Sequence, residues 1–161
     1  MVVDTSVIVA ILFGEFDAPL FEQSLAGVKT RLLSAVTRAE VACVVEGRKG
    51  HAGRLDLERL LSAGDFEVVG VTPEHAEIAF EAFRRFGKGR HPAGRNIGDC
   101  FSYALATSTG HALLFKGNDF GNTDIRGALT PRRNGPSLVQ GQSPWPCLRA
   151  MPQLDHYAVR P

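Results

Sequence analysis

Short apolar runs that alternate with segments of helical spacing restrict the fold of this chain more than any other feature. The runs lie at 2–3, 31–33, 66–71 and 112–115. Between each pair of neighbouring runs lie two segments in which apolar residues recur every three or four positions. The runs predict buried strands and the intervening segments predict helices. A chain that alternates in this way forms a mainly parallel sheet covered by helices, so the sequence predicts an α/β fold.

Capping residues predict where several helices begin and end. Thr72 followed by Pro73 is a strong helix start, because threonine caps the first turn and proline fits its first position. Gly110 is expected to end a helix over 97–109. Glycines at 47, 50 and 53 predict a break after the second strand. The predicted helices span 5–13, 17–25, 34–48 or 37–48, about 55–61, 73–86 and 97–109.

The chain divides into a body and a tail of different composition. Residues 131–161 contain six of the nine prolines and show no periodicity. We therefore predict one domain over 1–130 and an irregular, proline-rich tail over 131–161. A body of this length can bury a sizeable core.

Charge and cysteine content exclude several classes of protein. The net charge is +1, so the molecule as a whole does not attract a nucleic acid electrostatically. Nucleic-acid binding would therefore need a local patch of basic residues. No leader or membrane-spanning run is visible, so we expect a cytoplasmic protein that does not enter membranes. Cys43, Cys100 and Cys147 lack the spacing of a zinc or redox site, and the first two lie in apolar helical patterns typical of small core residues.

Four acidic residues stand where a reaction could use them. Asp4 ends the first strand and Asp119 follows the last, and the carboxyl ends of parallel strands meet at one edge of the sheet. Glu40 lies on an apolar helix face, where a carboxylate is costly to bury unless it is paired or binds a metal. Asp99 lies in the first turn of a helix, where the dipole favours a negative charge.

Each of the four has a simpler interpretation. Asp4 and Asp119 could cap helices, Asp99 could be an ordinary first-turn acid, and Glu40 could reach the edge of the buried face. The functional hypothesis depends on their occurring together. Oxygen ligands without histidine or cysteine suit hard cations such as Mg²⁺ and Mn²⁺.

Four segments resemble the PIN-domain ribonucleases, most closely the toxin components of VapBC toxin–antitoxin pairs. They are MVVDTS at the start, TRAE at 37–40, GDCFSYALA at 98–106 and KGNDFGNTD at 116–124. They fall in the family's order and cover about residues 1–130. The tail over 131–161 has no counterpart in that family.

The resemblance implies a three-layer α/β/α fold with a mainly parallel central sheet, and a metal-dependent endoribonuclease. It implies that Mg²⁺ or Mn²⁺ is held by four catalytic acids, Asp4, Glu40, Asp99 and Asp119. Ser6 and Thr5 are expected to support this site, with Asn118 and Asp124 as accessory residues. The implied partners are an RNA substrate, a small DNA-binding antitoxin that joins the toxin in a hetero-oligomer, and a second copy of the chain in a homodimer.

Basic residues near the proposed site could bind the RNA backbone. Lys88, Arg90 and Arg95 precede Asp99 and alternate with glycines, which let a backbone approach a phosphate. Lys116 lies close to Asp119 in the sequence. The alternative is that these are ordinary solvated charges.

Other functions fit the sequence less well. A haloacid-dehalogenase-like phosphatase also has an aspartate after its first strand, but it needs a second one two positions later, where this chain has Ser6. No glycine motif for a dinucleotide follows the first strand. A catalytically weak PIN-like domain that only binds RNA or an antitoxin is the remaining alternative, and the presence of all four acids argues against it.

Overall fold

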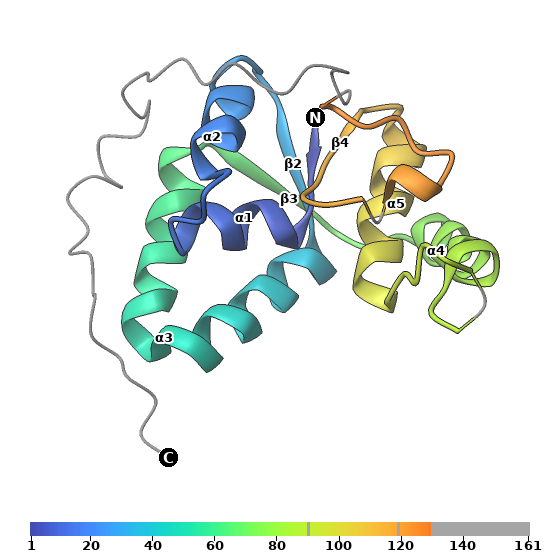
Figure 1. Cartoon of the computed structure of the whole chain (residues 1–161), viewed down its shortest axis with the longest axis horizontal. Coiled ribbons are helices and arrows are strands. Elements are labelled where there is room, and N and C mark those ends of the chain that lie inside the picture. Colours follow the sequence, from blue (N-terminus) through green and yellow to red (C-terminus); the bar gives the residue numbers. More distant parts are fainter. Residues whose placement is uncertain (90, 119, 130–161) are drawn as a thin grey trace.

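The computed structural model describes residues 1–89, 91–118 and 120–129. Within them, four strands form one parallel sheet in the order β3-β2-β1-β4 (Figure 1). The strands are β1 (Val2–Val3), β2 (Arg31–Ser34), β3 (Phe66–Val69) and β4 (Leu113–Leu114). The first strand of the chain is therefore central, which places the residue that follows it in the middle of the sheet's carboxyl edge.

Helices cover both faces of this sheet. In Figure 1, α1, α2 and α3 lie on one side of the strands, and α4 and α5 lie on the other. The helices are α1 (Thr5–Leu12), α2 (Ala18–Ala26), α3 (Ala35–Ala63), α4 (Pro73–Phe86) and α5 (Ile97–Thr109), with a 3₁₀ turn at Phe120–Asn122. The expected three-layer α/β/α arrangement is confirmed.

Alternate strand residues supply the two cores between the layers. Val3 packs with the apolar residues of α1, α2 and α3, whereas Val2 packs with those of α4 and α5. Leu33 and Leu32 divide in the same way, as do Leu114 and Leu113. Successive side chains of a strand point to opposite faces, so two-residue strands that are apolar throughout can serve both cores.

The predicted glycine break is confirmed at one position. Gly50 has φ 56° and ψ −152°, a conformation that is essentially confined to glycine, and α3 bends there. Gly47 and Gly53 are helical instead, so the two predicted helices continue to the bend and then on to Ala63. Gly53 is buried where a β-carbon would come within 2.7 Å of Val45 Cγ1, which gives this glycine a packing role.

Some predicted boundaries and burials differ from the structure. β3 ends at Val69, and β4 contains two residues where four were predicted. Cys100 is buried as expected, but the prediction that Cys43 lies in the core was wrong. Val41 and Val45 lie on the side of α3 that faces the core. Cys43, two positions from each, lies on another side of the helix and is exposed to solvent.

Some predictions fall outside the described part of the chain. They concern Arg90, Asp119, Cys147 and the tail, and the proposed domain boundary at residue 130 stays a prediction with them. Within the described residues, the structure contains no helix that is both long enough and apolar enough to cross a membrane.

Candidate active site

Asp4 follows β1 directly and caps α1. Its Oδ2 atom accepts hydrogen bonds from the Ser6 backbone N–H at 3.0 Å and from Ser6 Oγ at 2.7 Å. The side chain is buried, and its other oxygen, Oδ1, has no hydrogen-bond partner among the described residues. A buried carboxylate oxygen without a partner is costly. One oxygen of Asp4 therefore serves the helix cap, and the other is available to a ligand.

Glu40 brings a second carboxylate to the same place from α3. Thr5, the first residue of α1, donates a hydrogen bond from Oγ1 to Glu40 Oε2 at 2.6 Å. On its other side the carboxylate lies against Gly98, the second residue of α5. Glu40 thus sits between the first turns of two helices that begin at the carboxyl edge of the sheet.

Asp99 supplies the third carboxylate from α5. Asn96 caps this helix with its side chain, and the Asn96 N–H donates back to Asp99 Oδ2 at 2.9 Å. The pKa of Asp99 is raised to about 6, mainly by burial and also by the charges of Asp4 and Glu40, against the lowering effects of the Asn96 N–H and Arg95. The charges of Asp4 and Glu40 are therefore near enough to Asp99 to disfavour its ionised form.

Ser6 connects this cluster to the segment that leads to Asp119. Its hydroxyl donates to Asp4 and accepts a hydrogen bond at 3.0 Å from the backbone N–H of Lys116, which follows β4 closely. The ammonium group of Lys116 turns to Glu15 and Asp17, and these contacts raise its pKa. The residue predicted to bind RNA is thus held in ion pairs with the connection between α1 and α2.

The other predicted basic residues differ in exposure. Arg95 is buried, donates through Nε and Nη2 to the carbonyl of Ala93, and pairs with Asp99 at 3.3 Å. Its guanidinium also lies 4.7 Å from the centre of the Phe120 ring. Lys88 is exposed in the turn before it. Of these two, Lys88 has the solvent-facing position that a phosphate contact requires.

The two predicted accessory residues have different contacts. Asn118 is exposed, and its backbone carbonyl accepts a hydrogen bond from Gly121 at 3.0 Å. Asp124 is bound instead by Tyr103 Oη and Arg85 Nη2, both at 2.7 Å, and the Tyr103 hydrogen bond is the main cause of its lowered pKa.

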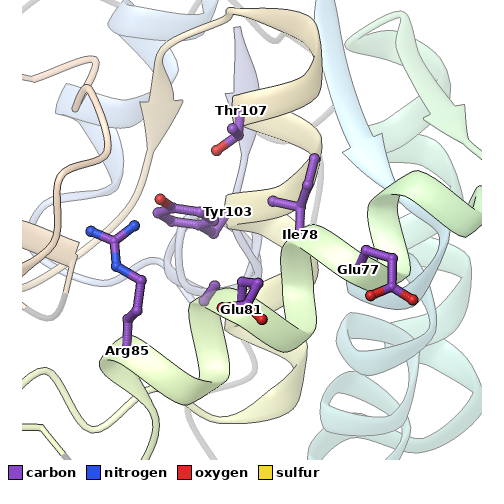
Figure 2. A pocket seen from close by; sticks show the side chains of 7 residues that line it. Glu77, Ile78, Glu81, Arg85, Tyr103 and Thr107 are labelled. Atoms are coloured by element: carbon purple, nitrogen blue, oxygen red, sulfur yellow. The ribbon is translucent and has the colours of Figure 1, made fainter.

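An open pocket of about 290 Å³ lies beside the Asp124 contacts, between α4 and α5. Tyr103 and Arg85 face each other at its side (Figure 2). Its full lining is Glu77, Ile78, Glu81, Ala82, Arg85, Tyr103 and Thr107. None of the three predicted catalytic acids that the structure describes, Asp4, Glu40 and Asp99, belongs to this lining.

The three described acids suit a metal by their chemistry, although they do not complete a site. Among the described residues, no group of three histidine, cysteine, aspartate or glutamate side chains is arranged to hold one ion. The donors are all oxygen atoms, as Mg²⁺ and Mn²⁺ prefer, and Asp4 Oδ1 is buried without a partner. The fourth predicted ligand, Asp119, lies outside the described residues.

Sequence reasoning missed the role of two residues in this site. Asn96 stands three positions before Asp99, and an asparagine followed at that spacing by an acid is a recognisable capping pattern. Gly98 has no such signal, because the residue that packs against it comes from another helix.

Comparisons with known proteins show which family the chain resembles. The model of the PIN domain matches residues 1–126. Ribonuclease VapC30 of Mycobacterium tuberculosis strain H37Rv is 45% identical over 131 residues, which are 81% of this chain and 100% of that protein. Ribonuclease VapC of Mycolicibacterium smegmatis is 47% identical over 125 residues, 78% of this chain and 97% of that protein.

Two solved structures share the fold. The crystal structure of Mycobacterium tuberculosis VapC20, described as a sarcin-ricin loop cleaving toxin, superposes with a TM-score of 0.64 at 20% identity, covering 77% of this chain and 95% of that one. A toxin–antitoxin complex from Klebsiella pneumoniae gives a TM-score of 0.56 at 16% identity, covering 76% and 92%. Since the PIN domain match and the VapC relatives extend over most of its length, the chain belongs to the PIN-domain family, as a protein of the VapC type.

Proposed function

We propose that this chain is the toxin of a VapBC-type pair and an endoribonuclease that hydrolyses RNA with the help of Mg²⁺ or Mn²⁺. The observation that carries the proposal is the proximity of Asp4, which follows β1 and caps α1, to Glu40 of α3 and Asp99 of α5. Curated relatives at 42–47% identity are named as VapC ribonucleases.

The side chains of the site have different roles in the proposed reaction. Asp4, Glu40, Asp99 and Asp119 would hold the cation, which when bound supplies a more acidic water and neutralises charge on the phosphate. Ser6 and Thr5 orient the Asp4 and Glu40 carboxylates through the hydrogen bonds described above. Asn96 orients Asp99 through its backbone N–H.

The partners in this proposal come from the position of basic residues near the site and from the resemblance to VapBC toxins. Lys88 and Arg90 precede the helix that carries Asp99, so they are candidates to contact phosphates of the RNA. A small antitoxin would block the acidic cluster, and toxin and antitoxin would form a hetero-oligomer. Homodimerisation is part of the same proposal.

Cleavage of RNA by the purified full-length chain tests the proposed activity. We expect cleavage with Mg²⁺ or Mn²⁺, none in excess chelator, and a loss of at least about 100-fold in Asp4→Asn and Asp99→Asn. Asp56→Asn is the matched control, because Asp56 pairs with Arg59 on the surface of α3 and should leave cleavage unchanged.

Two results would contradict the proposal. The first is cleavage that continues in chelator or in both site variants. The second is a folded wild-type chain that binds RNA without cutting it, which would support the alternative of a binding module.

A further inference from the structure

Gly98 and Glu40 come into unusually close contact although they belong to different helices. A β-carbon placed on Gly98 would lie 2.8 Å from Glu40 Oε2 and 2.9 Å from both Oε1 and Cδ. Separations below 3.0 Å essentially do not occur for real β-carbons. The observed position of the Glu40 carboxylate therefore excludes any side chain at residue 98.

The backbone does not explain the glycine. Gly98 is buried within the helical segment α5, and its φ is not in the left-handed region where glycines of this chain such as Gly50 are found. Alanine is favoured over glycine within a helix by up to about 1 kcal/mol. The three atoms nearest to the would-be β-carbon all belong to the Glu40 carboxylate, the end of a flexible side chain that can rotate away.

The same contact determines where Glu40 points. Thr5 holds one oxygen of the carboxylate from α1, and the bare backbone at Gly98 lets the group approach the start of α5. Asp99 is the next residue along that helix, so its backbone adjoins the place where the Glu40 carboxylate lies. A carboxylate pushed off Gly98 would have to take another position relative to Asp99.

We propose that Gly98 is a positioning residue: its missing side chain provides the space in which the Glu40 carboxylate lies beside Asp99, so that both acids can serve one cation. This inference rests on the proposed function and names a residue that acts through Glu40. Many mutations in a metal site weaken both metal binding and the fold. A methyl group at residue 98 should weaken the metal site without weakening the fold.

The test compares Gly98→Ala with Gly47→Ala in the full-length chain. Gly47 is an exposed helical glycine of α3 whose β-carbon would contact nothing within 4 Å, so it controls for the gain in helix propensity. We expect Mn²⁺ binding, measured by electron paramagnetic resonance, to weaken about 10- to 100-fold in Gly98→Ala. RNA cleavage should fall with it, whereas Gly47→Ala should bind and cleave like the wild type.

Measurements of stability and a double variant show whether Gly98→Ala lowers Mn²⁺ affinity by displacing Glu40. Urea unfolding in chelator should show Gly98→Ala at least as stable as the wild type. In a Glu40→Ala background, adding Gly98→Ala should cause no further loss of Mn²⁺ affinity, because the carboxylate it displaces is gone.

The outcomes separate this inference from the proposed function. A wild type that binds Mn²⁺ and cuts RNA, with an unchanged Gly98→Ala, would overturn the role of Gly98 alone. The role would also be overturned by a Gly98→Ala chain that unfolds more easily in chelator, or by an equal loss of affinity in the Glu40→Ala background. A wild type that neither binds Mn²⁺ nor cuts RNA would overturn both.

Discussion

At the scale of single residues, the two oxygens of Asp4 have different surroundings. Oδ2 holds the first turn of α1 through both donors of Ser6, while Oδ1 is buried without a partner among the described residues. Asparagine is about as good a helix cap as aspartate, so the structural role can be kept while the charge is removed.

Asp4→Asn should therefore fold normally and lose its response to cations. In chelator at neutral pH we expect the variant to be at least as stable as the wild type. The reason is that the substitution removes the negative charge that repels the carboxylates of Glu40 and Asp99. Added Mn²⁺ should raise the urea midpoint of the wild type and leave that of the variant unchanged. An equal rise in both proteins would count against Asp4 as a ligand.

Ser6→Ala should loosen the site without removing a ligand. The hydroxyl of Ser6 joins Asp4 Oδ2 to the backbone N–H of Lys116, so its loss frees both. We expect Mn²⁺ affinity to fall about 10- to 100-fold, as for other groups that orient metal ligands. Ser24→Ala is the matched control, since Ser24 Oγ donates to a carbonyl one turn earlier in α2. Equal affinities in the two variants would disprove a positioning role for Ser6.

At the scale of elements, the two halves of α3 have different roles, and the bend between them allows both. Its first half carries Glu40 to the site, and its second half brings Leu57 and Leu60 into the core shared with α1 and α2. The bend at Gly50 lets each half lie along the surface it covers. In Figure 1 the two halves run in clearly different directions.

Gly50→Ala should consequently destabilise the whole chain. The φ of 56° and ψ of −152° at this position cost a residue with a β-carbon about 1–3 kcal/mol, whatever space surrounds it. Urea unfolding would measure the loss, and Gly47→Ala, in a helical conformation three positions earlier, should instead gain up to about 1 kcal/mol. Equal free energies of unfolding for the two variants would show that alanine at residue 50 causes no backbone strain, and would contradict this prediction.

At the scale of the whole molecule, Asp124 fastens the segment after β4 to the layer of α4 and α5. It accepts hydrogen bonds from Tyr103 on α5 and Arg85 on α4. These contacts lower its pKa, and a carboxyl with a lowered pKa stabilises the folded state when it is ionised. The contribution is present above the unfolded pKa of about 4 and is lost as the pH falls through the lower folded value.

The stability difference between the wild type and Asp124→Asn should depend on pH in that direction. At pH 7 the wild type should be more stable, by less than about 1 kcal/mol because Asp124 is half exposed. The difference should shrink below about pH 4. Chemical unfolding at several pH values measures it, and in a Tyr103→Phe background it should be smaller throughout. A difference that stays constant or grows in acid would contradict this account.

Local signals predicted the elements because they act over one or two turns. The cap at Thr72, the stop at Gly110 and the break at Gly50 each depend on neighbours a few positions away. The burial of Cys43 was predicted wrongly, since the pattern around it was apolar enough to fit either side of α3.

The partners of the basic and accessory residues were beyond the reach of the sequence. Lys116 binds Glu15 and Asp17, and Asp124 binds Tyr103 and Arg85, all of them distant along the chain. Which charges pair depends on the distances that packed layers impose. A motif records only which charges are present.

The sequence by itself determined that strands and helices alternate, where several helices start and stop, and that acids follow the strand ends. Only the tertiary structure decided that Glu40 lies against Gly98 beside Asp99, and that Arg95 turns inward. The physical reason is range: backbone preferences are local, whereas the cost and benefit of burying a charge depend on what the folded layers bring within a few ångströms of it.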